Sequence, residues 1–187
     1  TINESHINYC VADTMLSIEN FQVEASHQYI RANGVASKRA DDSLRVELGH
    51  IDAGFILPFV LPEKEFKLGG YVTGWATLYN LFNQPVFEAD VRLDSAQIND
   101  VYLGTALATL ELDKETKNIL IDGDVYTPTE RFLAHVDGEV VTATKHWGIT
   151  IYPDSVPLGF INHWTDGIIS DISGYGSGVV DVFGENH

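Results

Sequence analysis

The stretch YVTGWATLY, from Tyr71 to Tyr79, carries no charge on either face if it is extended. Successive side chains of a strand point to opposite sides. One face therefore holds Tyr71, Thr73, Trp75, Thr77 and Tyr79, and the other holds Val72, Gly74, Ala76 and Leu78. Two uncharged faces are typical of a strand that is buried on both sides or that faces an aromatic lumen. The stretch predicts a β-rich fold, with either a dry two-layer core or an interior able to hold a ligand.

Strand-like runs surround this stretch throughout residues 35–153. The runs are rich in Val, Thr, Tyr, Phe and Ile, are separated by turn signals, and have no helix-period segment between them. We expect about eight to ten strands, and short connections make them antiparallel. A single sheet of that width must curl into a barrel or split into two layers. The sequence therefore predicts an all-β fold, an antiparallel β-barrel, with a β-sandwich as the alternative.

The 187 residues suit a single domain in which the two ends differ from the centre. In residues 1–33, Ile7, Val11, Met15 and Ile18 recur at helical spacing, which predicts a helix within 5–20, followed by a strand from Phe21. In the centre, the prolines of FILPFVLP predict an edge strand, a bulge or a loop there. Residues 154–187 predict a helical stripe from Ile161 to Ile172 and then a closing strand or packed tail.

A two-residue hairpin is predicted at Asp137-Gly138, within HVDGEV, because this dipeptide suits a tight turn between two strands. The resulting register puts His135 and His146 on one polar face and sends Trp147 into the core. The two histidines would then lie about 20 Å apart, too far to share a metal ion.

Composition excludes several classes of function. The net charge of −16 repels phosphate backbones and anionic lipids, so we expect no nucleic-acid partner. The single cysteine forms no intrachain disulfide or thiolate cluster and favours a reducing cytoplasm. No apolar run is long enough to span a bilayer. Phosphate-binding, dinucleotide-binding and His-Glu-x-x-His motifs are absent, so we expect no cofactor and no metal.

Acidic residues are frequent enough that some must lie close together. Asp122 and Asp124 would share a strand face, as would Glu88, Asp90 and Arg92. Such pairs could shift each other's pKa or hold Ca²⁺. Because no calcium-loop pattern surrounds them, we interpret them as turn and solvent-face acids.

Aromatic content and the uncharged faces suggest a barrel that binds a small, mostly apolar organic molecule. Such a protein could also isomerise or cyclise its ligand without a cofactor, since shape and one or two proton carriers suffice. The expected wall residues are Tyr71, Trp75, Tyr79 and Tyr102, and the expected proton carriers are His146 and Glu88. The alternative is a non-catalytic structural or protein-interaction domain. Its acidic surface would meet a partner, or a sheet edge would pair with a second copy in a homo-oligomer.

Overall fold

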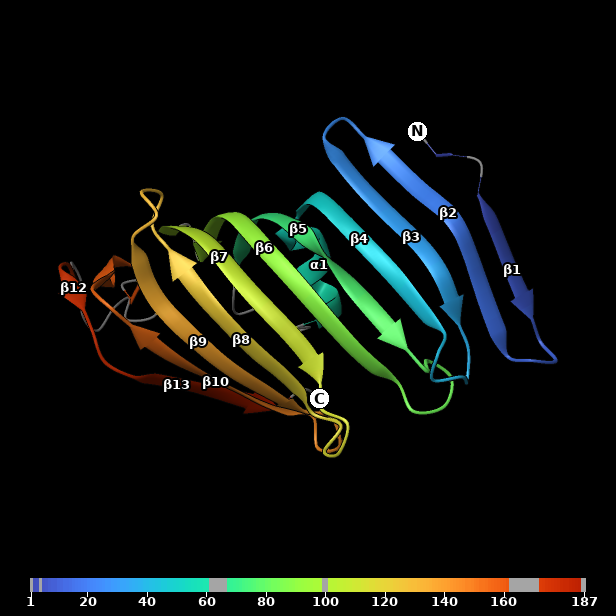
Figure 1. Cartoon of the computed structure of the whole chain (residues 1–187). Helices are drawn as coiled ribbons and strands as arrows, with labels where there is room; N and C mark the ends of the chain where they lie inside the picture. Colours follow the sequence, from blue (N-terminus) through green and yellow to red (C-terminus); the bar gives the residue numbers. More distant parts are fainter. Residues whose placement is uncertain (1, 4, 61–66, 99–100, 162–171, 186–187) are drawn as a thin grey trace.

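A computed structural model describes residues 2–3, 5–60, 67–98, 101–161 and 172–185. Eleven strands form one antiparallel sheet in the order β1 to β10 and then β13 (Figure 1). The strands are β1 His6–Cys10, β2 Met15–Ala25, β3 Gln28–Ala36, β4 Ser43–Asp52, β5 Leu68–Tyr79, β6 Val86–Ile98, β7 Val101–Leu112, β8 Ile119–Tyr126, β9 Phe132–Val141, β10 His146–Pro153 and β13 Val180–Glu185. A second sheet pairs β11 Val156–Pro157 with β12 Tyr175–Gly176, and the helices are α1 Ala53–Val60 and η1 Leu158–Ile161.

The strand register divides the large sheet into an apolar face and a polar face. Residues directly opposite each other on paired strands share a face. One row across ten strands contains Phe21, Ala32, Val46, Ala76, Ala89, Leu110, Ile121, Gly138, Ile149 and Val182. The adjacent row contains Gln22, Arg31, Glu47, Trp75, Asp90, Thr109, Asp122, Asp137, Thr150 and Asp181. Strand alternation thus sorts the sequence onto two chemically different surfaces.

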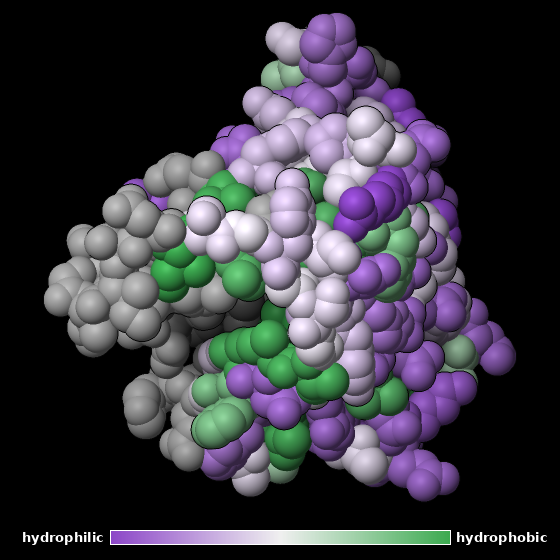
Figure 2. All heavy atoms as spheres, turned by 90° about the vertical axis from the view of Figure 1, so that its left-hand side faces the viewer, coloured by the Kyte–Doolittle hydropathy of each residue, from purple (hydrophilic) through white to green (hydrophobic). Residues whose placement is uncertain are grey.

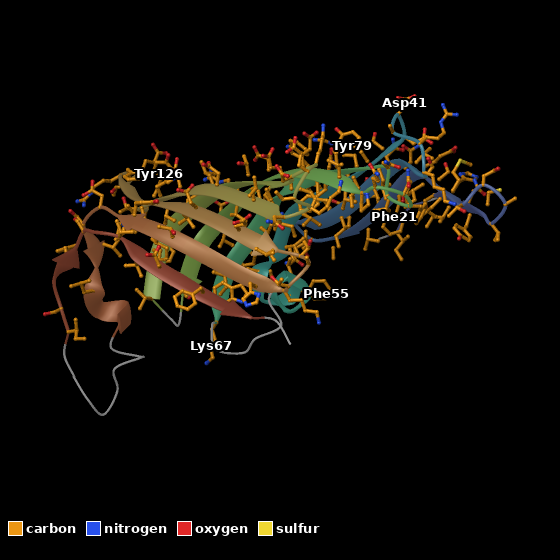
Figure 3. All side chains as sticks on the ribbon, turned by 90° about the horizontal axis from the view of Figure 1, so that it is seen from below. Phe21, Asp41, Phe55, Lys67, Tyr79 and Tyr126 are labelled. Atoms are coloured by element: carbon orange, nitrogen blue, oxygen red, sulfur yellow. The ribbon has the colours of Figure 1, made fainter. Side chains whose placement is uncertain are left out.

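Helix α1 lies against the apolar face. Its contacts are with β4 and β5, and Figure 3 shows Phe55 of this helix on the opposite side of the sheet from Tyr79 and Tyr126. The Asp52 carboxylate accepts a hydrogen bond from the Gly54 backbone N–H at 2.7 Å, which caps the start of the helix. The edge strand, bulge or loop expected at FILPFVLP is therefore wrong.

The sheet is open, with β1 and β13 as its two edges. An all-β, antiparallel fold is confirmed, but closure into a barrel is not. Of the closing strand or packed tail expected near the C-terminus, a strand is observed as β13, which pairs with β10 but leaves the sheet open. The helical stripe expected from Ile161 to Ile172 falls largely in 162–171, outside the described residues. Within the described residues, neither helix is long and apolar enough to cross a membrane.

The predicted N-terminal helix is wrong, because residues 6–25 form the β1–β2 hairpin. Ile7 and Ile18 face each other directly across this hairpin. Their separation along the chain reflects a cross-strand pair and not successive helical turns. The turn is closed by a hydrogen bond of 3.3 Å from the Thr14 N–H to the Val11 carbonyl, and Thr14 has a φ of +48°.

The hairpin predicted at Asp137-Gly138 is also wrong, because β9 runs straight through both residues. Gly138 lies in the apolar row between Ile121 and Ile149, where a Cβ would stand 3.2 Å from the Ile121 Cβ. Its lack of a side chain thus serves close packing rather than a turn. The chain reverses after Val141 instead, and His146 pairs opposite Val141.

Candidate functional site

The apolar face forms a surface that we call the trough. Its centre consists of two adjacent rows from β4 to β10, which contain Val46, Ala76, Ala89, Leu110, Ile121 and Ile149, and Leu48, Val91, Ala108, Val136 and Ile151. All of these side chains are only half-buried. Figure 2 shows apolar residues gathered around a hollow on the side of the molecule nearest β11 to β13. The face that would be a dry core in a two-layer fold is therefore accessible here.

Residues with small side chains at the centre of the trough leave space above the sheet. Ala76 and Ala89 lie in one row, and Gly74 and Ala108 lie in the adjacent row, on the neighbouring strands β5, β6 and β7. At Gly74 a Cβ would stand 2.3 Å from the Asp90 carbonyl oxygen, so the close approach of β5 and β6 requires glycine. Small side chains between larger ones shape a depression that can accept an apolar group.

The polar face carries an acidic open groove of about 800 Å³ across β5 to β10. Its acidic lining residues are Glu88, Asp90, Glu111, Asp122, Asp137 and Glu139. Trp75 also lines the groove and has the Arg45 guanidinium 4.4 Å above its ring. This lining suits a cationic or strongly hydrated partner better than an apolar one.

The structure brings together three of the site residues expected from the sequence. Trp75, Tyr79 and Glu88 lie on the polar face, and the Tyr79 hydroxyl donates a 2.7 Å hydrogen bond to the Glu88 carboxylate. This hydrogen bond, with burial and the Glu88 charge, raises the pKa of Tyr79. Tyr71 shares this face, and its ring stacks on His50 with 4.0 Å between ring centroids. The expected aromatic wall thus stands on the opposite side of the sheet from the trough.

Two further expected site residues lie apart from this group. Tyr102 is half-exposed and lies opposite Gln97 near the start of β7. His146 is exposed at the start of β10. Four strand spacings separate it from β6, which carries Glu88, and correspond to about 19 Å along the sheet. The two expected proton carriers are therefore not placed to act on one small molecule together.

A cluster of one histidine and three aspartates on β8 and β9 was not predicted. His135 Nδ1 lies 2.9 Å from Asp124 Oδ1, and Nε2 lies 3.2 Å from Asp137 Oδ1 and 3.8 Å from Asp122 Oδ2. The hydrogen bond to Asp124, followed by the charges of the other two carboxylates, raises the pKa of His135 against the opposing effect of burial. Proton binding at His135 therefore reduces the repulsion within the cluster.

The turn before this cluster has a sequence signal, but the turn by itself does not give the register that brings the four residues together. Pro128 lies in the connection between β8 and β9, which is closed by a 2.8 Å hydrogen bond from the Thr127 N–H to the Arg131 carbonyl. A register shift between Val125 and Tyr126 then sets Asp124 opposite His135 and Asp122 opposite Asp137. The hairpin predicted at residues 137–138 paired the residues of β9 with one another, whereas β9 pairs with β8 in the structure.

The fold and the site place the protein in a broad class, the proteins built on an open antiparallel sheet with one apolar and one acidic face. The chain matches no family model, and no curated protein or solved structure shows significant similarity to it.

Proposed function

We propose that the protein binds a mostly apolar organic molecule in the trough. The observation that carries this proposal is the pair of adjacent, half-buried apolar rows, which no charged side chain interrupts between β4 and β10. Accessible apolar surface of this extent is uncommon in monomeric proteins and marks a place where a ligand or a partner is buried. In this proposal the open trough holds the ligand that we expected in a barrel lumen.

Hydrophobic transfer supplies the affinity for such a ligand. Each methylene that moves from water into apolar surroundings contributes about 0.8 kcal/mol, or roughly a fourfold change in affinity. Because the rows continue over six strand spacings, about 29 Å, an extended alkyl chain gains contacts as it lengthens. The polar end of an amphiphile would remain in water at the mouth of the hollow.

The proposal concerns binding rather than catalysis. Tyr71, Trp75 and Tyr79 lie on the face opposite the trough, so they do not wall this ligand. Isomerisation or cyclisation would need proton carriers at the ligand, and Glu88 and His146 lie on the polar face about 19 Å apart along the sheet.

Displacement of a polarity-sensitive dye by single-chain alkyl amphiphiles of increasing length tests the proposal. We expect affinity to rise about fourfold per methylene. Ala108→Asp places a charge in the trough and should weaken binding at least tenfold. The neighbouring Thr109→Asp places the same charge on the polar face and should leave binding unchanged. Circular dichroism establishes that both variants fold. Affinity that ignores chain length, or equal effects of the two variants, would refute binding in the trough.

A second candidate is self-association through a sheet edge, as a non-catalytic interaction domain. Edge strand β1 exposes Ile7 by 55% and Tyr9 by 60%, and edge strand β13 exposes Phe183 by 82%. Folded proteins commonly protect such edges with charges or prolines. A second copy could add its own edge strand here. Native mass measurements over a range of protein concentrations test this idea, and an Ile7→Lys variant should then shift any dimer to monomer. A monomer at all concentrations would eliminate the candidate.

A further inference from the structure

The cluster of His135, Asp122, Asp124 and Asp137 combines one imidazole with three carboxylates on two adjacent strands. The candidate ligand atoms of Asp122, His135 and Asp137 all lie within 4.8 Å of one another. The cluster lies on the polar face, away from the trough. It is independent of the proposed apolar ligand, so either proposal can fail without the other.

The orientation of the imidazole is fixed from one side. Asp124 Oδ1 lies 2.9 Å from Nδ1, where the carboxylate can accept the Nδ1 proton. A neutral ring held in this way has its lone pair on Nε2. Nε2 is the nitrogen that faces Asp137 at 3.2 Å and Asp122 at 3.8 Å. A carboxylate that holds one imidazole nitrogen so that the other can bind a metal ion is a recurring arrangement in metalloproteins.

Among the described residues, no lysine or arginine forms an ion pair with Asp122, Asp124 or Asp137. Arg45 binds Glu47 with 3.1 Å between Nε and Oε1, and Arg92 binds Asp94 with 2.8 Å between Nε and Oδ1. A lone pair on Nε2 and two carboxylates then face one another without a positive charge between them. A cation at that point would convert mutual repulsion into attraction.

We infer that His135, Asp122 and Asp137 bind a divalent transition-metal ion, with Asp124 as the residue that positions the imidazole. A mixed set of one imidazole nitrogen and two carboxylate oxygens favours Zn²⁺ and similar ions, whereas Ca²⁺ and Mg²⁺ prefer oxygen ligands alone. Three protein ligands leave coordination positions open to water or to another ligand. The side chains of His135, Asp137 and Asp122 are 34%, 51% and 71% exposed, so an ion can enter directly from solvent.

Calorimetric titration of the metal-free full chain with Zn²⁺ tests the site. We expect one ion per chain, and at least tenfold weaker binding in both His135→Gln and Asp137→Asn. His146→Gln is the matched control, because it removes an exposed histidine from the same face at a distance from the cluster. It should leave the affinity unchanged. Equal affinity in wild type and His135→Gln would overturn the inference, since it would mean that Zn²⁺ binds elsewhere.

Two spectroscopic measurements separate coordination from diffuse attraction of cations. Co²⁺ should give visible d–d bands in the wild type that are lost in His135→Gln. Nitrogen NMR of the Zn²⁺ form should show His135 protonated on Nδ1 and a shifted Nε2 signal. The Asp124→Asn variant should still bind one ion per chain, with an affinity about 10- to 100-fold lower. The tautomer of the His135 ring should also change. Unshifted His135 signals, or Ca²⁺ binding as tightly as Zn²⁺, would show that the aspartates only collect counter-ions.

Discussion

Replacing Gly104 with alanine should destabilise the fold by an amount that the structure allows us to work out. Gly104 is buried in β7 and has a φ of +129°, which residues with a Cβ rarely adopt. A Cβ there would stand 2.1 Å from the Tyr126 carbonyl oxygen and 2.8 Å from the Thr127 carbonyl carbon. Both neighbours are backbone atoms, so no side chain can move aside.

Two effects of the substitution lower the free energy of unfolding, and one effect raises it. Backbone strain of this kind costs about 1–3 kcal/mol, and overpacking costs about 1–3 kcal/mol more. Alanine also restricts the unfolded chain, which offsets about 0.4–1 kcal/mol. The free energy of unfolding of Gly104→Ala should therefore fall by about 1–6 kcal/mol. With a urea m-value of about 2 kcal/mol/M, the unfolding midpoint falls by about 0.5–3 M.

Gly148→Ala is the matched control, because Gly148 is also a strand glycine but has no positive φ. A Cβ there would meet no other atom within 4 Å. Only the restriction of the unfolded chain by alanine remains, so the free energy of unfolding of this variant should rise by about 0.4–1 kcal/mol. Urea unfolding followed by circular dichroism measures both variants. If Gly104→Ala unfolds at the same urea concentration as Gly148→Ala, the inferred backbone crowding at Gly104 is incorrect.

Three other substitutions test local chemistry. Glu88→Gln should lower the pKa of Tyr79 towards its usual 10.0, because it removes the charge and weakens the hydrogen bond that raise this pKa. Tyrosine NMR titration measures the pKa of Tyr79, and an unchanged value in the variant would contradict the prediction. Asp113→Asn should destabilise at neutral pH, because hydrogen bonds from the turn after β7 lower the Asp113 pKa below 3.8. The contribution of the ionised Asp113 to stability is present above the pKa that Asp113 has in the unfolded chain, and it is lost as the pH falls through the lower pKa of the folded state. Acid titrations of stability should therefore converge for variant and wild type, and a constant difference would contradict the assignment. Trp147→Phe should cost less than about 1 kcal/mol in urea unfolding, because the buried Trp147 Nε1 has no hydrogen-bond partner among the described residues.

The division into two faces could be predicted from the sequence because it depends on neighbouring residues alone. Strand alternation separates Trp147 from His146, and the structure places Trp147 opposite Val140 while His146 is exposed. The same rule assigns Asp122 and Asp124 to one face. Which side chains meet across strands depends on where each turn begins. That position was misjudged at residues 137–138, so the cluster around His135 was not predicted.

The curl of the sheet was harder to predict, because it depends on bulges that do not coincide with any one residue type. Gly70, with a φ of +124°, lies at one of these bulges, between β5 and β6. Three others place two residues opposite one, at Glu19–Asn20, Gly49–His50 and Asp94–Ser95, and the second residue of each has a φ of +51°, +55° and +55°, respectively. Such bulges bend and twist a strand.

These bulges also disguise the strand pattern in the sequence. Leu48 and Ile51 both point to the apolar face although they are three residues apart, because a bulge lies between them. A spacing of three resembles a helical period when it is read alone. The side chain opposite the bulge distinguishes the two cases: the His50 N–H donates to Thr73 Oγ1 at 3.1 Å, and the Asn20 N–H donates to Asn33 Oδ1 at 3.2 Å. A polar side chain on the neighbouring strand thus satisfies the donor that the bulge removes from the ladder. Whether the strands curl into a trough or close into a barrel depends on such cross-strand pairs, which no single run of sequence contains.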